Sequence, residues 1–393
     1  MRAYVFIFLC AFCSVALLTP MVRRLAVKVG AVQAIRKRDV HTVPTPRMGG
    51  VAMFLGFALS LCFARGIPWL RSLFQGNGYQ QWVILLGAFF ICLIGVLDDI
   101  FDLDWMLKLG GQMFAAIFVA WKGVQLVSIP WGSTLLSLSS FSSMAITILL
   151  ILISINAVNF IDGLDGLAAG IVGIGALAFS VYSYILSKSQ PSFSSMSTLL
   201  NVILVGICAG FLVHNWHPAS IFMGDSGSMM LGYVLTCASL VLTGRFVPSL
   251  RHSGVYLPVF MPILLPLLVL FIPVLDMVLA IIRRLLKGQS PMHPDRMHLH
   301  HRMLKIGHSV VGAVLILWAW AFVIAFGSIL TLFIPFLMVL AIACAVVPVL
   351  TFLTLAPHYK QRLTELGIIG NRGSHERKGN GPPGSDPSKK DHK

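Results

Sequence analysis

Apolar residues fill the chain in long runs that short polar segments separate. Each run covers about 15 to 25 residues, which suits an α-helix that crosses the hydrocarbon core of a bilayer. The mean hydropathy of the 393-residue chain is +0.87 and only 11% of its residues are charged, so an ordinary soluble domain is excluded. We predict an all-α polytopic membrane protein with eleven transmembrane helices, at about residues 3–20, 48–64, 82–97, 107–121, 142–158, 165–187, 198–213, 227–243, 256–282, 309–330 and 332–355.

Lys and Arg are unevenly distributed over the polar segments between these runs. With the predicted spans, 22 of the 29 basic residues fall on one side of the membrane. Because basic residues beside spans are retained in the cytoplasm, we predict an external N-terminus and a cytoplasmic C-terminus, with the first run kept as a span. Residues 1–356 would form the membrane domain. Residues 357–393, rich in Gly, Pro, Ser and Lys, would form a disordered, basic cytoplasmic tail.

The net charge of +15 raises the question of an anionic partner. Because the excess lies beside spans and in the tail, the headgroups of the lipid bilayer are the simpler partner, and we expect no nucleic acid. All seven Cys lie inside predicted spans, where packing explains them better than disulfides or thiolate metal ligands.

The scarce acidic residues cluster where apolar runs end. The chain has only 14 Asp and Glu, and Asp98 and Asp99 follow directly on the third run. Two carboxylates about 4 Å apart repel by roughly 4 kcal/mol at an effective dielectric near 20, so such a pair favours a bound cation. A hard ion such as Mg²⁺ suits oxygen ligands drawn from separate loops. A solvated acidic loop that includes Asp102 and Asp104 is the alternative.

Two further polar segments lie on the same predicted side. Polar residues recur every third position where the fifth run ends, at Asn156, Asn159, Asp162 and Asp165. This spacing places them on one face of a helix or its last turn, as expected for a polar cavity, although helix capping is the alternative. In the segment Phe222–Ser228, Asp225 opens a run whose backbone N–H groups could face a phosphate, unless Asp225 is only a cap.

Basic residues in two loops provide candidate phosphate ligands. The loop after the ninth run contains Arg296, His298, His300 and His301, and Arg with His suits phosphate or pyrophosphate better than a zinc ion. Arg47 precedes a Gly pair at a span entrance, where it could bind a lipid phosphate. Asp276, inside an apolar run, is expected to face the interior of the bundle. The competing class is a transporter, which would place such polar groups at mid-membrane.

In this order, the motifs resemble those of the polyprenyl-phosphate N-acetylhexosamine-1-phosphate transferases, over about residues 1–355. The matching segments are Asp98-Asp99-x-x-Asp102, Asn156-x-x-Asn159-x-x-Asp162-Gly163-x-Asp165-Gly166, Phe222–Gly227 and His298-x-His300-His301. The resemblance implies a bacterial plasma-membrane enzyme whose site faces the cytoplasm. It would use Mg²⁺ or Mn²⁺ to transfer a sugar-1-phosphate from a UDP-sugar to a polyprenyl phosphate, releasing UMP.

Details of these motifs favour the branch that uses UDP-GlcNAc over the branch that uses UDP-MurNAc-pentapeptide. The pentapeptide enzymes typically carry Lys where this chain has Asp102, and a different His motif. The sequence around Arg47 is similar to the corresponding segment of actinobacterial members, which hints at a decaprenyl acceptor. The sequence leaves a homodimer open.

The resemblance also implies roles for the candidate residues. We expect Asp98, Asp99 and Asp225 to be catalytic, with Asp225 binding the metal ion together with one of Asp98 and Asp99, here taken as Asp99. Phe222 is expected to stack on uracil. The other substrate-binding candidates are Arg47, Asn156, Asn159, Asp162, Asp165, Arg296, His298, His300 and His301.

Overall fold

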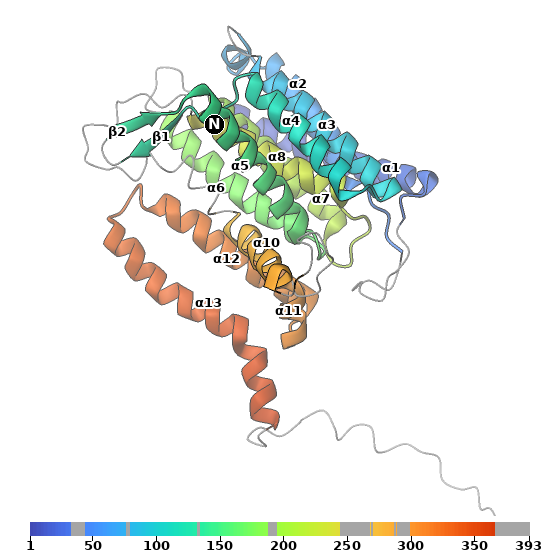
Figure 1. Ribbon diagram of the computed structural model, residues 1–393, viewed down its shortest axis with the longest axis vertical. Coiled ribbons are helices and arrows are strands. Elements are labelled where there is room, and N and C mark those ends of the chain that lie inside the picture. Colours follow the sequence, from blue (N-terminus) through green and yellow to red (C-terminus); the bar gives the residue numbers. More distant parts are fainter. Residues whose placement is uncertain are drawn as a thin grey trace, which may run out of the picture.

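The computed structural model describes residues 1–32, 44–75, 79–131, 134–187, 195–243, 268, 270–286, 288 and 299–365. Within these ranges the chain is a bundle of long helices with one small hairpin (Figure 1). Its elements, in chain order, are α1 (Arg2–Val29), α2 (Gly49–Gly66), the 3₁₀-helix η1 (Arg71–Phe74), α3 (Gln80–Phe101), α4 (Trp105–Trp121), β1 (Ser128–Trp131), β2 (Thr134–Ser137), α5 (Ser140–Ile161), α6 (Leu167–Ser187), α7 (Met196–Asn215), α8 (Gly224–Thr243), α10 (Phe271–Leu286), α11 (Leu299–Ile306), α12 (Val310–Leu330) and α13 (Phe336–Glu365).

The helices confirm an all-α polytopic membrane protein. In the described part of the chain, nine helices are long and apolar enough to cross a membrane. A tenth predicted span, 107–121, corresponds to the shorter apolar helix α4. The ninth predicted span, 256–282, begins outside the described residues, and α10 covers its end. The total of eleven spans and their orientation stay predictions.

Several helices begin at a serine that the sequence places just before an apolar run. Ser139 accepts a hydrogen bond from the backbone N–H of Ser142, and Ser309 accepts one from that of Gly312. A side-chain oxygen at this position satisfies one of the N–H groups that the first turn of a helix leaves without a partner. These caps define where α5 and α12 begin.

Helix α8 forms the centre of the bundle. It packs against α2, α3, α5, α6 and α7. In an 18-residue stretch of α8, 94% of the residues are buried, against 11% in α13, which lies at the edge of the bundle in Figure 1. The N-terminal turn of α8 carries Asp225, so the most enclosed helix of the bundle positions one of the candidate site residues.

Glycines let two neighbouring helices approach the backbone of the first turn of α8. A Cβ atom on Gly50, in α2, would lie 2.1 Å from the backbone nitrogen of Gly227. A Cβ atom on Gly95, in α3, would lie 2.3 Å from the Cα of Ser226. Real Cβ atoms do not come so close to backbone atoms, so any larger residue would push these helices away from the start of α8.

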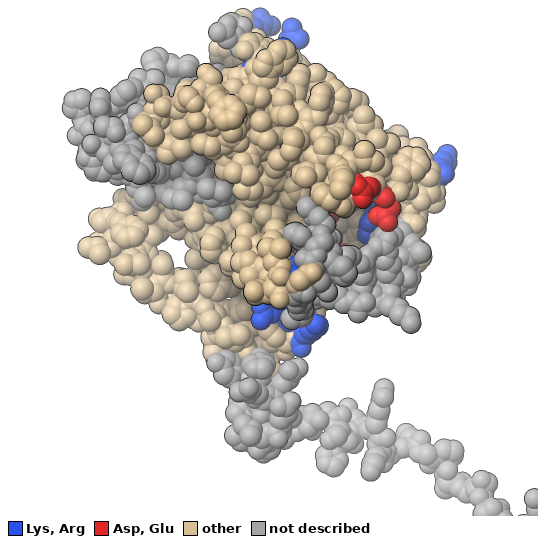
Figure 2. All heavy atoms as spheres, in the orientation of Figure 1, with Lys and Arg blue, Asp and Glu red and all other residues tan. Residues whose placement is uncertain are grey.

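Two features differ from the sequence-based description. The strands β1 and β2 form an antiparallel hairpin, with Ser128 opposite Ser137, in a segment predicted only as a loop. Helix α13 continues to Glu365, beyond the predicted end of the last span at residue 355. Residues 366–393 of the predicted tail lie outside the described residues. On the face drawn in Figure 2, the acidic atoms form a single group with a few Lys or Arg atoms next to it.

We expect Gly95→Ala to destabilise the protein by about 1 to 3 kcal/mol, because the added methyl group forces α3 away from α8. The midpoint of thermal unfolding in detergent, followed by tryptophan fluorescence, should fall. Gly110→Ala in α4 is the matched control, since a Cβ atom there meets nothing within 4 Å and Ala favours a helix. Equal unfolding midpoints for both variants would contradict the packing argument.

Candidate active site

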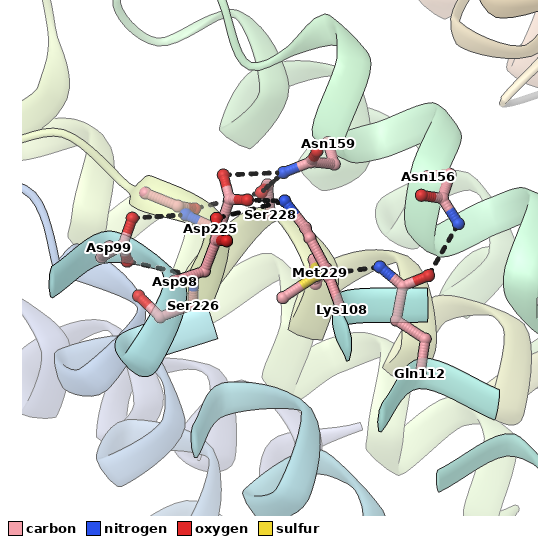
Figure 3. Close-up of polar contacts among 11 residues, drawn as sticks. Asp98, Asp99, Lys108, Gln112, Asn156, Asn159, Asp225, Ser226, Ser228 and Met229 are labelled. Carbon is pink, nitrogen blue, oxygen red and sulfur yellow. Dashed lines mark hydrogen bonds and ion pairs between the residues drawn. The ribbon is translucent and has the colours of Figure 1, made fainter. Parts of the chain in front are cut away.

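Asp99 fixes the start of α8 against the end of α3. Its Oδ1 accepts a hydrogen bond from the backbone N–H of Asp225 at 2.9 Å, and its Oδ2 accepts one from that of Ser226 at 3.2 Å (Figure 3). The first N–H groups of a helix have no partner within the helix and form the positive end of its dipole. Asp99 satisfies both needs, so its carboxylate is a cap supplied by a neighbouring helix.

Lys108 lies between the carboxylates of Asp98 and Asp225. Its ammonium group is 3.3 Å from Oδ2 of Asp98 and also contacts Oδ2 of Asp225 (Figure 3). The three side chains are 13 to 22% exposed, so the group is partly enclosed yet open to solvent. A single cation therefore lies between two carboxylates that come from α3 and α8.

The turn between α3 and α4 explains why Lys108 faces Asp98. Asp102 ends α3 with a φ of 53°, and its N–H bonds to the carbonyl of Asp98. Asp104 begins α4, because its side chain accepts a hydrogen bond from the N–H of Met106. This three-residue reversal brings the first turn of α4 beside the last turn of α3. Asp102 and Asp104 thus serve as helix ends in the loop that the sequence marked as acidic.

Two asparagines on α5 extend the network. The amide of Asn159 donates hydrogen bonds of 3.0 Å to Oδ1 of Asp225 and to Oγ of Ser228. One helical turn earlier, the amide of Asn156 donates to Oε1 of Gln112 at 2.8 Å (Figure 3). Gln112 lies one turn after Lys108 on α4 and is buried. Polar side chains therefore link helices α4, α5 and α8 at two positions that lie one helical turn apart.

The segment around Arg47 pairs with the segment that leads into α8. The N–H of Phe222 donates to the carbonyl of Pro46 at 2.9 Å, and the N–H of Gly49 donates to the carbonyl of Phe222 at 3.0 Å. These backbone bonds bring Arg47 and Phe222, two residues that the sequence selected in different loops, to the same end of the bundle. The side chains of both residues are half-buried.

Asp162 follows α5 directly and lies outside the spanning helices. Burial raises the pKa of its carboxyl group from 3.8 to about 7. The positive charge of Arg47 opposes this shift in pKa, whereas the carboxylates of Asp99 and Asp165 add to it. Asp162 therefore shares an electrostatic environment with Asp99 and Arg47, which connects the motif at the end of α5 to the start of α8.

Asp165 connects the turn before α6 to the loop between α7 and α8. It is buried, and its Oδ2 accepts hydrogen bonds from Nδ1 of His217 at 2.7 Å and from the N–H of Ala219 at 3.1 Å. Asn215 supports the same contact, because its side chain accepts from the N–H of Gly166 and donates to the carbonyl of Ile221. Asp165 thus fixes the loop that contains Phe222, and its contacts are with the protein itself.

The histidine motif is described only in part. Arg296 and His298 lie outside the described residues, whereas His300 and His301 lie on α11, where their side chains are not described. The first N–H of α11, that of Leu299, donates to Oδ1 of Asp276 at 2.9 Å. Asp276 is buried in α10. The prediction that it faces the bundle interior is confirmed.

A divalent cation can be tested against the residues present. Within the described ranges, no three or more His, Cys, Asp and Glu side chains group as a metal site. Mg²⁺ commonly uses only one or two protein carboxylates, with water and substrate phosphates as its other ligands. Asp98 and Asp225 already direct oxygens toward a shared cation, Lys108, so the donor set fits. The two oxygens of Asp99 accept the N–H groups of α8.

Sequence reasoning missed Lys108, Gln112 and Ser228 as members of this site. Lys108 lies at the start of the predicted span 107–121 and entered only the count of basic residues on the cytoplasmic side. The four-residue spacing of Lys108 and Gln112, at the start of an apolar run, was the available signal, since it places both polar groups on one helix face. Ser228 follows Asp225 by three residues and lies on the same face as Asp225.

Fold and site together define a polytopic membrane protein with a partly enclosed carboxylate centre at the ends of its spanning helices. The family model described as glycosyl transferase family 4 matches residues 81–243. That range contains all the side chains of the centre, from α3, α4, α5 and α8.

Three similar proteins specify the family further. The chain is 40% identical over 345 residues to the decaprenyl-phosphate N-acetylglucosaminephosphotransferase of Mycolicibacterium smegmatis, covering 86% of this chain and 85% of that protein. It is 34% identical to a probable undecaprenyl-phosphate N-acetylglucosaminyl 1-phosphate transferase of Bacillus subtilis, over 85% and 88% of the two chains. For the undecaprenyl-phosphate alpha-N-acetylglucosaminyl 1-phosphate transferase of Yersinia pestis, the identity is 31%, over 77% and 76%. The chain belongs to this family of polyprenyl-phosphate N-acetylglucosamine-1-phosphate transferases, which confirms the resemblance seen in its motifs.

We expect the stability gained by Asp162→Asn to grow with pH. The carboxyl group has a pKa of about 7 when folded and 3.8 when unfolded, so between these values the folded state holds a proton that the unfolded state has lost. Wild-type stability therefore falls as pH rises through this window, and the cost is complete above pH 7. Unfolding midpoints in EDTA should differ more at pH 8 than at pH 5. An equal difference at the two pH values would contradict this burial cost.

Asp276→Ala should loosen the start of α11, because the N–H of Leu299 loses its acceptor. Loss of such a cap costs about 1 kcal/mol, or roughly fivefold in local opening. Hydrogen–deuterium exchange of peptides from 299–306 should be faster in Asp276→Ala and close to wild type in Asp276→Asn, whose amide oxygen can still accept. Unchanged exchange in the Ala variant would show that Asp276 does not hold this helix.

Proposed function

We propose that this protein transfers GlcNAc-1-phosphate from UDP-GlcNAc to a membrane polyprenyl phosphate, giving polyprenyl-diphosphate-GlcNAc and UMP. The observation that carries the proposal is the centre formed by Asp98, Lys108 and Asp225 at the ends of spanning helices, in a chain of this family. The product would start the assembly of a cell-wall polysaccharide. The relatives named above act on decaprenyl or undecaprenyl phosphate, so the prenyl length stays open.

Mg²⁺ or Mn²⁺ is the proposed cofactor. Asp225 would hold the ion together with Asp98, whose Oδ2 faces the same cation in the structure. Asp99, the second ligand expected from the sequence, is less suited because both its oxygens accept N–H groups of α8. When bound, the ion would neutralise the charge of the diphosphate and of the departing UMP.

The residues of the chain would supply position and charge for an in-line transfer. Asn159 orients the carboxylate of Asp225 through its amide. Arg47 brings a positive charge toward Asp99 and Asp162, where it could bind a lipid phosphate. That phosphate needs no strong base, because its second pKa of about 6 leaves it largely dianionic at neutral pH.

Nucleotide and sugar would be held by the surrounding motifs. Phe222 would stack on uracil, in a loop that Asp165 and Asn215 fix in place. Asn156 and Asp162 would line the same side of the site. The remaining candidates for the diphosphate and sugar are Arg296, His298, His300 and His301.

The site is proposed to face the cytoplasm from the bacterial plasma membrane. The ends of α1 and α10 lie at the same end of the bundle, because the N–H of Arg47 donates to the carbonyl of Ala31 and the guanidinium of Arg284 lies 5.8 Å from the ring centroid of Phe160. These two helix ends carry the basic residues Arg23, Arg24, Lys28, Arg283 and Arg284. Such charge is retained in the cytoplasm, where a water-soluble nucleotide sugar is available. A prenyl phosphate anchored in the bilayer would present its headgroup at this interface.

The test compares two nucleotide sugars side by side. The purified protein, with polyprenyl phosphate and Mg²⁺, should release UMP from UDP-GlcNAc and not from UDP-MurNAc-pentapeptide, and EDTA should stop the release. UMP from the pentapeptide substrate alone would overturn the choice of sugar. If neither substrate released UMP, a transporter would again become the alternative to test.

We further expect Asp225→Asn to lower UMP release by at least about 100-fold, because it removes the charge that attracts a cation without changing the shape of the side chain. Asp104→Asn is the matched control, since Asn also caps a helix, and it should stay within about twofold of wild type. Near-normal turnover in folded Asp225→Asn would remove this residue from the catalytic centre.

A further inference from the structure

Lys108 occupies the position between carboxylates that a divalent cation would share. Its ammonium contacts Oδ2 of both Asp98 and Asp225, and its side chain is only 19% exposed. A lysine at a helix end commonly extends its charge into water. Here the side chain is instead directed inward from the first turn of α4, so its charge is used to neutralise the site.

A divalent ion and this ammonium cannot share the two carboxylates at low cost. A double and a single positive charge that share the same two carboxylates repel each other strongly in a partly enclosed site. The ammonium would therefore withdraw when the ion binds. The flexible four-carbon stem of lysine allows this, but the withdrawn charge then needs an anion as a new partner.

The diphosphate of a nucleotide sugar is such an anion. We propose that Lys108 is an internal counter-ion that competes with the divalent ion for Asp98 and Asp225, so that metal and nucleotide bind cooperatively. This inference rests on the proposed function, from which it takes the metal and the diphosphate. Because coupling between two ligands is reciprocal, the nucleotide strengthens metal binding by the same factor as the metal strengthens nucleotide binding.

Direct measurement of Mn²⁺ binding tests the competition without relying on turnover. The free Mn²⁺ signal in electron paramagnetic resonance would be titrated with purified protein, with and without UDP. We expect Lys108→Gln to bind Mn²⁺ at least tenfold more tightly than wild type when UDP is absent. UDP should tighten Mn²⁺ binding less in this variant than in wild type, because no ammonium remains to be displaced.

Two further variants separate charge from folding. Lys108→Arg keeps the positive charge and should bind Mn²⁺ as weakly as wild type. Lys122→Gln is the matched control at the other end of α4, about 21 Å away, where the ammonium stacks on Trp121; it should behave as wild type. Mn²⁺ without UDP should raise the unfolding midpoint of Lys108→Gln more than that of wild type.

The outcomes distinguish the two levels of the proposal. Equal or weaker Mn²⁺ binding by folded Lys108→Gln, with UMP release from wild type intact, would overturn the competition and leave the proposed function standing. The absence of bound Mn²⁺ from every protein, with or without UDP, would overturn the metal assignment together with the inference drawn from it.

Discussion

The contact between the Asp99 carboxylate and the first turn of α8 is the interaction on which the site depends. A carboxylate within a membrane helix is costly unless it is fully hydrogen-bonded, and two N–H groups of α8 meet that need. The contact requires α3 to reach the backbone of α8, which Gly95 permits. Because α8 is also the most enclosed spanning helix described, its first turn has little freedom, and Asp225 is presented in a fixed direction.

Five of the acidic residues fall into two groups by what they accept. Asp99, Asp104 and Asp276 each receive N–H groups at the start of a helix. Asp98 and Asp225 instead share a side-chain cation. Backbone N–H groups cannot leave a carboxylate, whereas an ammonium can be replaced. The pair that faces Lys108 is therefore the pair suited to exchange one cation for another during a reaction.

Much of the fold and of the site composition follows from the sequence, for identifiable reasons. The spans could be predicted because the thickness of the hydrocarbon core sets their length. The three-residue spacing from Asn156 to Asp165 likewise predicted polar groups at one helix end. The partners of each carboxylate could not be predicted from the sequence, because they come from helices that are distant along the chain. Lys108 was missed for this reason, and Asp99 was expected at the metal although its oxygens accept the N–H groups of α8. The hairpin β1–β2 carries no signal as strong as the apolar runs around it.

The exposure of the centre suits a reaction between a soluble and a lipid-anchored substrate. Asp98, Lys108 and Asp225 are 13 to 22% exposed, which is enough for contact with a ligand but limits the water around the charges. Charges in such a setting interact more strongly than on an open surface. A transporter would need comparable groups at mid-membrane. Here they gather at the ends of α3 and α5 and the starts of α4 and α8, where the proposed prenyl phosphate and nucleotide substrates would meet.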